Sequence, residues 1–126
     1  MQFEHFNISA PQGLLEQVKD FYLILFELEL GFRPDFPDQG YWLYFKTQPV
    51  IHLSQDEMRQ GANDAGYLDH IAFRLEGIER FTQKLSQLNI PYKINPVPQL
   101  NMQQVFLHDP TGIKLEINFV NEGKAS

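Results

Sequence analysis

The chain of 126 residues contains no cysteine. Neither a disulfide framework nor a thiolate metal site can form, so any metal ion must be bound by His, Asp, Glu or backbone oxygen atoms. Basic residues are also scarce: 10 Lys and Arg stand against 16 Asp and Glu, and no basic run occurs. This balance argues against a nucleic-acid groove or an anionic membrane surface as partner, and favours a small molecule or a protein.

Long hydrophobic runs are absent as well. The longest apolar run is far too short to span a bilayer, and the N-terminus lacks a basic segment followed by an apolar one. We therefore expect a cytoplasmic protein that does not bind membranes. The apolar segments form one continuous pattern over a length that can bury one core, so we expect a single domain over residues 1–126.

The first half of the chain predicts one strand, one helix and further strands. Residues 3–9 alternate apolar and polar side chains, as a half-buried strand does. After Pro11, which suits a first helical turn, apolar residues recur at helical spacing, and Gly31 suits the helix end or the turn after it. A turn rich in Pro, Asp and Gly follows, and then two aromatic or β-branched runs at 41–47 and 49–55. This order is βαβββ.

The second half repeats this order from Leu68. A strand over 68–75 precedes a helix with apolar residues at helical spacing, and three more strands follow, with a type I turn at "DPTG" between the last two. We predict an α+β fold of two βαβββ modules that form a curved mixed sheet with a concave metal-binding face. The expected boundaries are about 1–54 for module one, about 55–66 for a linker, about 67–120 for module two and 121–126 for a frayed tail.

Four polar side chains stand between apolar neighbours at equivalent places in the two modules. His5 corresponds to His70 and His52 to Glu116, at offsets of 65 and 64 residues. Strand alternation directs all four to the face opposite the helices. If the two units pair with approximate two-fold symmetry, these side chains converge. A buried carboxylate there needs a positive partner, which a divalent metal ion would supply.

Each of these residues also has a simpler interpretation. A lone His on a strand is more often a surface or hydrogen-bonded residue than a ligand, and Glu116 alone would be a solvated residue on an open sheet face. Their joint placement favours the metal site. His108, beside the predicted turn, has no counterpart among these four residues, so we expect it on the surface, the lip of the pocket being the alternative.

The segments "HFNIS", "FYLILFELELGFRP", "LDHIAFR" and "FLHDPTGIKLEINF" resemble the vicinal oxygen chelate superfamily. This superfamily includes glyoxalase I, extradiol dioxygenases, fosfomycin-resistance proteins, methylmalonyl-CoA epimerase and bleomycin-resistance proteins. The resemblance covers almost the whole chain. It implies that His5, His70 and Glu116 are metal ligands, as in dioxygenase and fosfomycin-resistance members. His52 departs from the glyoxalase pattern, which has Glu or Gln there, so Glu116 would be the one carboxylate able to act as base.

The resemblance further implies a divalent metal-dependent enzyme that chelates a small substrate through vicinal oxygens, with glyoxalase-type isomerase or lyase chemistry or ring-opening dioxygenation. Four protein ligands would close a tetrahedral zinc site, so catalysis requires an expanded site for Zn, Ni, Fe, Mn or Co. The alternatives are a binding protein that sequesters a small molecule without catalysis, and a fold whose metal is structural. Homodimers are common in the family, so the resemblance also implies a homodimer.

Some residues near these strands could bind the substrate. They share the ligand face or lie on strands that would wall the cavity, and an Arg among them could hold a carboxylate. For the aromatic ones, core packing is the alternative. The candidate substrate-binding residues are Asn7, Trp42, Tyr44, Arg74 and Phe106.

Overall fold

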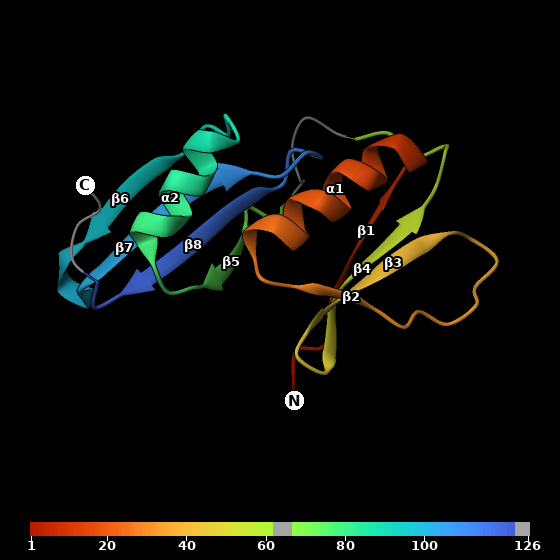
Figure 1. Ribbon diagram of the computed structural model, residues 1–126, viewed down its shortest axis with the longest axis horizontal. Helices are drawn as coiled ribbons and strands as arrows, with labels where there is room; N and C mark the ends of the chain where they lie inside the picture. The colour runs from red at the N-terminus through yellow and green to blue at the C-terminus, as the bar shows by residue number, and fades with distance from the viewer. Residues whose placement is uncertain (62–66, 123–126) are drawn as a thin grey trace. The chain divides into compact units, whose positions relative to one another are not determined.

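The computed structural model describes residues 1–61 and 67–122. The chain divides into two compact units, residues 1–61 (unit 1) and residues 62–126 (unit 2). Each unit has the element order βαβββ and its own four-stranded mixed sheet, as Figure 1 shows, which confirms the prediction of an α+β fold built from two repeated modules. Residues 62–66 of the predicted linker and residues 123–126 of the predicted tail lie outside the described residues.

Unit 1 has a sheet of strand order β1-β4-β3-β2. Strand β1 runs parallel to β4, whereas β3 is antiparallel to both β4 and β2. Helix α1 provides the crossover from β1 to β2 at the opposite edge of the sheet, and the chain then returns through β3 to β4, which pairs with β1. The elements are β1 (Phe6–Ala10), α1 (Gln12–Leu25), β2 (Glu29–Gly31), β3 (Gly40–Phe45) and β4 (Gln48–Gln55).

Unit 2 has the same topology, with strand order β5-β8-β7-β6 and a parallel β5–β8 pair. Helix α2 again provides the crossover, and β7 is antiparallel to both of its neighbours. The elements are β5 (Ile71–Arg74), α2 (Ile78–Gln87), β6 (Lys93–Val97), the 3₁₀ turn η1 (Pro98–Leu100), β7 (Met102–His108) and β8 (Lys114–Val120).

The strand registers of the two units match. In unit 1, Phe6 pairs with Ile51, and in unit 2, Ile71 pairs with Leu115. These pairs are offset by 65 residues on the first strand and by 64 on the last, as the sequence predicts for the polar residues beside them. The repeat therefore holds at the level of individual backbone pairs.

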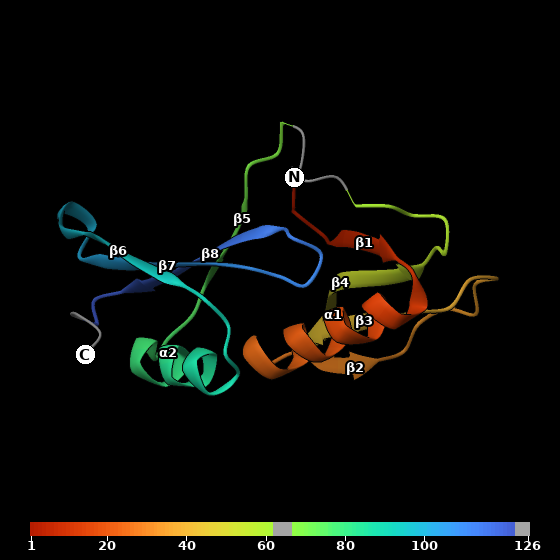
Figure 2. The same cartoon turned by 90° about the horizontal axis from the view of Figure 1, so that it is seen from above.

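Each sheet has one face covered by a helix. In unit 1, α1 lies on the sheet (Figure 2), and Leu15, Val18 and Tyr22 are fully buried along its inner side. In unit 2, Phe81 of α2 packs on Phe119 of β8, with ring centroids 5.6 Å apart. Burial of each large apolar side chain stabilises a unit by about 1.5–3 kcal/mol. No helix in the described part of the chain is both long and apolar enough to cross a bilayer.

The first helix ends earlier than Gly31 suggests. α1 stops at Leu25, and Glu27 takes the left-handed backbone conformation with a φ of 56°. Gly31 instead lies in β2, opposite Trp42. The residue after the last turn of α2, Asn89, has a φ of 57°, so both helices end in the same way. The sequence prediction for Gly31 was wrong because Glu27 bears the conformational strain that a glycine usually relieves.

A glutamate that follows the last strand of each unit caps that unit's helix. In unit 1, the Gln12 backbone N–H donates to Glu57 Oε1 at 3.0 Å. In unit 2, the backbone N–H groups of Gly77 and Ile78 donate to the Glu122 carboxylate at 2.8–3.0 Å. Such carboxylates satisfy otherwise unpaired helical N–H groups. Glu122, assigned to the frayed tail by the sequence, is thus part of the fold.

The turn between β7 and β8 forms where "DPTG" predicts it. The backbone N–H of Gly112 donates to the carbonyl of Asp109 at 2.9 Å, and Gly112 has a φ of 91°. The buried Asp109 carboxylate also accepts hydrogen bonds from the backbone N–H groups of Thr111 and Ile113, at 2.8 and 3.0 Å. The turn fixes the register of β8, and with it the face on which Glu116 lies.

Candidate metal centre

The unit 1 residues His5, His52 and Trp42 form a continuous aromatic stack. His5 immediately precedes β1, and its ring lies 3.7 Å from that of His52 on β4, with only 11° between the planes. Trp42 on β3 faces His52 across the antiparallel pair and stacks on it at 4.0 Å and 12°. The adjacent parallel and antiparallel registers thus bring two predicted ligands together, with Trp42 fixing the plane of one of them.

The environment of His52 favours a neutral imidazole. Burial, and next the nearby His5, lowers the pKa of His52 below its ordinary value, while a hydrogen bond with the Pro49 backbone partly opposes the shift. Its Nε2 atom is buried and has no hydrogen-bond partner, so the nitrogen that donates to the Pro49 carbonyl is Nδ1. A neutral imidazole with an unpartnered nitrogen is the form that binds a metal ion.

His5 has a different partner for the same ring nitrogen. Its Nδ1 lies 2.8 Å from Glu4 Oε1, and one third of the side chain is exposed. The preceding acidic residue therefore occupies Nδ1 and leaves Nε2 available. Glu4 is not among the site residues predicted from the sequence.

In unit 2, the other two predicted ligands, His70 and Glu116, are also in contact. His70 immediately precedes β5, and its Nε2 lies 3.3 Å from Oε1 of Glu116 on β8. Asn118, two residues further on the same face, donates to the other carboxylate oxygen, Glu116 Oε2, at 3.0 Å. The Glu116 side chain is only 14% exposed. A half-enclosed carboxylate with one oxygen directed at an imidazole nitrogen is a suitable pair of metal donors.

The Nδ1 atom of His70 contacts an acidic residue, as that of His5 does. It lies 2.8 Å from Asp69 Oδ2, and the Lys114 ammonium lies 3.6 Å from the same oxygen. The hydrogen bond with His70, and then the charge of Lys114, lower the pKa of Asp69. Asp69 and Glu4 are 65 residues apart, the same offset as His70 and His5. The repeated acid–His dipeptide was the sequence signal that could have identified both.

The structure thus brings two of the four predicted ligands into contact in each unit, His5 with His52 and His70 with Glu116. Within residues 1–61 and 67–122, no group of three or more His, Asp or Glu side chains forms a complete metal-binding cluster. The strand limits also differ from prediction, because β1 and β5 begin one residue after His5 and His70. Both histidines therefore lie immediately before the first strand of their unit.

The predicted substrate-binding residues of unit 1 lie on or beside the His52 face. Asn7 is exposed, pairs in register with His52 and donates to Ser54 Oγ at 3.1 Å. The Tyr44 hydroxyl donates to the Phe32 carbonyl at 2.5 Å, and its ring occupies the space above Gly31, where a Cβ would lie 2.5 Å from it. Tyr44 thus packs over β2, whereas Asn7 remains accessible.

In unit 2, Phe106 faces Glu116 across the β7–β8 pair, the position that Trp42 holds in unit 1. The Lys114 ammonium lies 5.2 Å from its ring centroid. Arg74 is exposed at the end of β5, and His108 is exposed at the end of β7. His108 also lines a cavity of about 450 Å³ together with Phe106 and Lys114.

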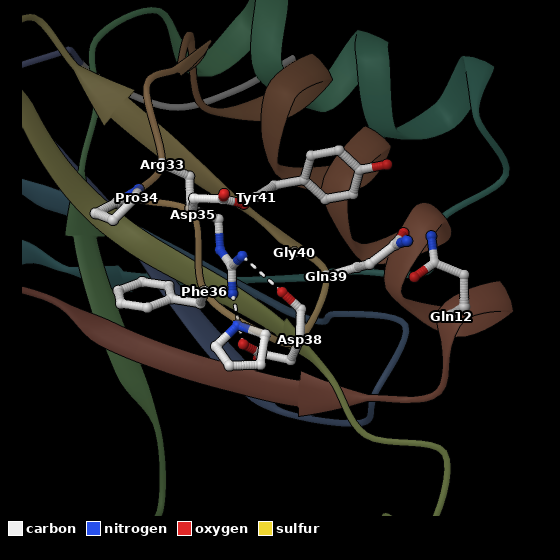
Figure 3. Close-up of a pocket in the computed structure, with 10 residues that line it drawn as sticks. Gln12, Arg33, Pro34, Asp35, Phe36, Asp38, Gln39, Gly40 and Tyr41 are labelled. Atoms are coloured by element: carbon white, nitrogen blue, oxygen red, sulfur yellow. Dashed lines mark hydrogen bonds and ion pairs between the residues drawn. The ribbon is translucent and has the colours of Figure 1, made fainter.

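Unit 1 includes two cavities of similar volume. One of about 470 Å³ is lined by His52, Trp42 and Glu4, and thus adjoins the histidine pair. The other, of about 480 Å³, is formed by the loop between β2 and β3 and was missed by sequence reasoning. Figure 3 shows Arg33 in this loop, reaching toward Asp38 with Phe36 beside it. Its guanidinium donates to the Asp38 carbonyl at 3.0 Å and pairs with the carboxylate at 3.3 Å.

No protein-family model matches the chain, and no curated protein matches it. Solved structures do match over nearly its full length. A glyoxalase family protein from Enterococcus faecalis has 22% identity and a TM-score of 0.69, with 93% of this chain and 96% of that one covered. A glyoxylase/bleomycin resistance protein/dioxygenase domain from Frankia sp. EAN1pec has 14% identity and a TM-score of 0.74, with coverage of 98% and 95%.

A third match is a mutant of FosX, the genomically encoded fosfomycin resistance protein of Listeria monocytogenes. Its structure contains Mn(II) and 1S,2S-dihydroxypropylphosphonic acid, and it has 15% identity and a TM-score of 0.71, with coverage of 94% and 92%. These similarities, together with the two βαβββ units, confirm the resemblance seen in the sequence at the level of fold. The chain has the fold of the vicinal oxygen chelate superfamily.

Proposed function

We propose that this protein is a divalent-metal-dependent enzyme that binds a small substrate through two neighbouring oxygens. The ligands would be His5 and His52 from unit 1, and His70 and Glu116 from unit 2. The carrying observation is that the repeat places an imidazole pair in one unit and an imidazole–carboxylate pair in the other at equivalent register positions. Titratable groups placed at equivalent positions of equivalent strands are typical of a functional site.

The donor set fits a metal ion. Two donors that bind one ion at about 2.0–2.2 Å with an angle of about 90–110° lie about 2.8–3.6 Å apart. The separation between His70 Nε2 and Glu116 Oε1 is 3.3 Å. In unit 1, the buried Nε2 of His52 has no other partner. Imidazole and carboxylate donors without thiolate suit Zn, Ni, Fe, Mn or Co.

When bound, the metal ion would supply Lewis acidity that stabilises negative charge on the substrate oxygens. As the one carboxylate of the set, Glu116 would detach from the ion to accept a proton from the substrate through Oε1, while the hydrogen bond from Asn118 to Oε2 keeps the carboxylate oriented. The Mn(II) and the vicinal diol phosphonate in the FosX structure support this class of cofactor and substrate. Isomerisation, lyase chemistry and dioxygenation all begin with chelation of this kind.

The walls of the site would bind the rest of the substrate. Trp42 and Phe106 hold equivalent positions beside His52 and Glu116, where they would contact apolar parts of a substrate. Asn7 and Arg74 are exposed polar groups on the ligand faces, and Arg74 would pair with an anionic group. Tyr44 would act by packing β2 beneath this wall, since its hydroxyl is already bonded to Phe32.

Metal analysis tests the proposal directly. Protein purified without a tag should contain a divalent ion or bind added Mn(II), Ni(II), Zn(II) or Fe(II) with one site per chain by calorimetry. Glu116→Gln should weaken binding at least ten-fold, because a charged donor is lost. His108→Ala is the matched control, since His108 lies outside the ligand set, and it should bind normally. Protein that neither carries nor takes up any of these ions would refute the proposal.

A second candidate function is the binding of a small molecule without turnover. The cavity of about 470 Å³ beside His52 and Trp42 favours it, because an aromatic wall and a polar rim suffice to hold a ligand. A panel of vicinal diols, hydroxyketones, catechols and epoxides, assayed on the metal-loaded protein, distinguishes the two. Binding without product formation would favour sequestration. A large loss of thermal stability on chelation, without activity, would favour a structural metal.

The homodimer remains a prediction. Light scattering on the purified protein, with and without metal, will give the mass in solution. A mass of twice 14.7 kDa would support it.

A further inference from the structure

The same hydrogen bond occurs at equivalent positions in both units. Glu4 Oε1 lies 2.8 Å from Nδ1 of His5, and Asp69 Oδ2 lies 2.8 Å from Nδ1 of His70. In both cases the acidic residue directly precedes the histidine at the entrance of the first strand. The carboxyl groups are three-quarters exposed, so burial does not force these contacts. Their repetition at an offset of 65 residues indicates a shared role.

The chemistry of imidazole gives this contact a consequence. A neutral ring has one N–H and one lone pair, and a carboxylate can only accept a hydrogen bond. A carboxylate beside Nδ1 therefore fixes the proton on Nδ1 and leaves the lone pair on Nε2. Partners of this kind fix the tautomer and orientation of metal-binding histidines and raise their basicity.

We propose that Glu4 and Asp69 are positioning residues that hold His5 and His70 in the Nδ1–H tautomer, with Nε2 presented to the metal ion. This inference rests on the proposed function. His52 reaches the same state through a backbone carbonyl, since its ring donates to Pro49 and its Nε2 lacks a partner. All three imidazoles thus have an acceptor at Nδ1, although it is a side chain in only two of them.

The contact between His70 and Glu116 in unit 2 supports a cation bound at Nε2 of His70. His70 lies between two carboxylates, with Asp69 at Nδ1 and Glu116 3.3 Å from Nε2. With the proton on Nδ1, the Nε2 lone pair faces the Glu116 oxygen, an arrangement that a cation between the two atoms stabilises. Lys114, 3.6 Å from Asp69, holds that carboxylate in place by charge. No lysine contact of this kind is recorded for Glu4 among the described residues.

Substitution of Asp69 should therefore reduce metal affinity more than substitution of Glu4. Asp69→Asn should weaken Mn(II) binding about ten-fold or more, and Glu4→Gln should weaken it by a smaller factor. An amide can still accept a hydrogen bond through its oxygen but can also present its N–H₂ group, so the tautomer is no longer fixed. Asp69→Glu should restore part of the affinity. Glu76→Gln and Glu29→Gln, which change exposed acidic residues elsewhere in the two units, are the charge-matched controls.

The experiment combines two readouts. Long-range ¹H–¹⁵N NMR of the metal-free protein at about pH 8 identifies the tautomer of each histidine, and calorimetry measures Mn(II) affinity. We expect Nδ1–H for His5 and His70 in the wild type, and mixed tautomers with weaker Mn(II) binding in the two variants. Wild-type rings protonated on Nε2, or variants that bind Mn(II) as tightly as the wild type, would overturn the inference while leaving the proposed metal site intact. Wild-type protein with Nδ1–H rings but no affinity for any divalent ion would overturn the proposed function and, with it, the role assigned to the two carboxylates.

Discussion

The two units share a backbone plan but present different chemistry on the face opposite the helix. In unit 1, His5, His52 and Trp42 form an aromatic stack around a buried, unpartnered nitrogen. In unit 2, His70 and Glu116 belong to a network of charged and polar groups that includes Asp69, Lys114 and Asn118. The equivalent positions Trp42 and Phe106 are aromatic in both.

The two units therefore share equivalent backbone positions, but the side-chain types at those positions differ. Topology fixes which residues face each other, since a parallel first–last pair places the residue before the first strand beside the last strand. The side chains at those positions then decide the chemistry. Unit 1 presents two imidazoles, and unit 2 presents an imidazole and a carboxylate. In the proposed metal site, the first unit would supply nitrogen donors and the second would also supply negative charge.

The largest loss of stability is expected at a position of unit 1 that is occupied by glycine and has no room for a side chain. At Gly40, an added Cβ would lie 2.0 Å from the Leu53 carbonyl oxygen, an atom that cannot move without disturbing the sheet. Gly40→Ala should therefore destabilise the protein by roughly 3 kcal/mol, the upper part of the range for overpacking. Urea unfolding monitored by Trp42 fluorescence measures this change, because Trp42 is the single tryptophan.

The matched control for Gly40 is Gln104, which faces Asn118 as Gly40 faces Ser54. Gln104→Ala removes a hydrogen bond from Asn95 but introduces no steric clash, so it should lower the free energy of unfolding by well under about 1 kcal/mol. Equal effects of the two substitutions would show that the local geometries of the two units are more alike than the structure indicates.

A smaller effect is expected at the helix caps, where the two units agree. Glu122→Gln should lower the free energy of unfolding by about 1 kcal/mol. The carboxylate accepts hydrogen bonds from two backbone N–H groups at the start of α2, and its negative charge interacts favourably with the positive end of the helix dipole. Glu57→Gln should cost less, since Glu57 accepts only one such bond from α1. Thermal unfolding in low salt measures both. A larger loss for Glu57 would contradict the order that hydrogen-bond number predicts.

The smallest effect concerns a cluster in unit 1 on the side of the sheet that α1 covers. Hydrogen bonds from Lys19 and then Tyr41 lower the pKa of Glu16, and the same contacts raise the pKa of Lys19 and of Tyr41. The Glu16 contribution to stability is thus present above about pH 4.5 and is lost as pH falls through the lowered pKa. The Tyr41 and Lys19 contributions are present below about pH 10.0 and 10.5 and are lost as pH rises through the raised values.

Glu16→Gln should therefore reduce stability at pH 7 by less than about 1 kcal/mol, because the side chain is 39% exposed and solvent screens it. It should also make stability fall less steeply below about pH 4.5. Chemical unfolding at pH 7, 4 and 3 measures both effects. Asp20→Asn, on the same helix, is the control, because Asp20 is a more distant partner of Lys19 at 3.5 Å. An unchanged acid slope in Glu16→Gln would show that the cluster does not contribute to the pH dependence.

Much of the fold could be predicted from the sequence, and so could the four residues proposed as metal ligands. Alternation and helical spacing identified both βαβββ units, and equivalent polar positions singled out His5, His52, His70 and Glu116. The contacts of His5 with His52 and of His70 with Glu116 came from the structure. The acid–His dipeptides were also visible in the sequence, but their meaning depends on the direction of each imidazole, which periodicity does not encode. The cavity formed by the loop between β2 and β3 was not predictable, since irregular backbone has no period to follow.

The absence of cysteine in the composition excludes thiolate chemistry. The pattern of side chains along the chain predicts the order of the elements, and strand alternation makes His5 equivalent to His70 and His52 equivalent to Glu116. The cap that Glu122 forms on α2 and the position of His52 between two aromatic rings became evident from the folded chain. These features arise from contacts between residues distant in sequence, whose free energy exceeds the local preferences that a sequence pattern reflects.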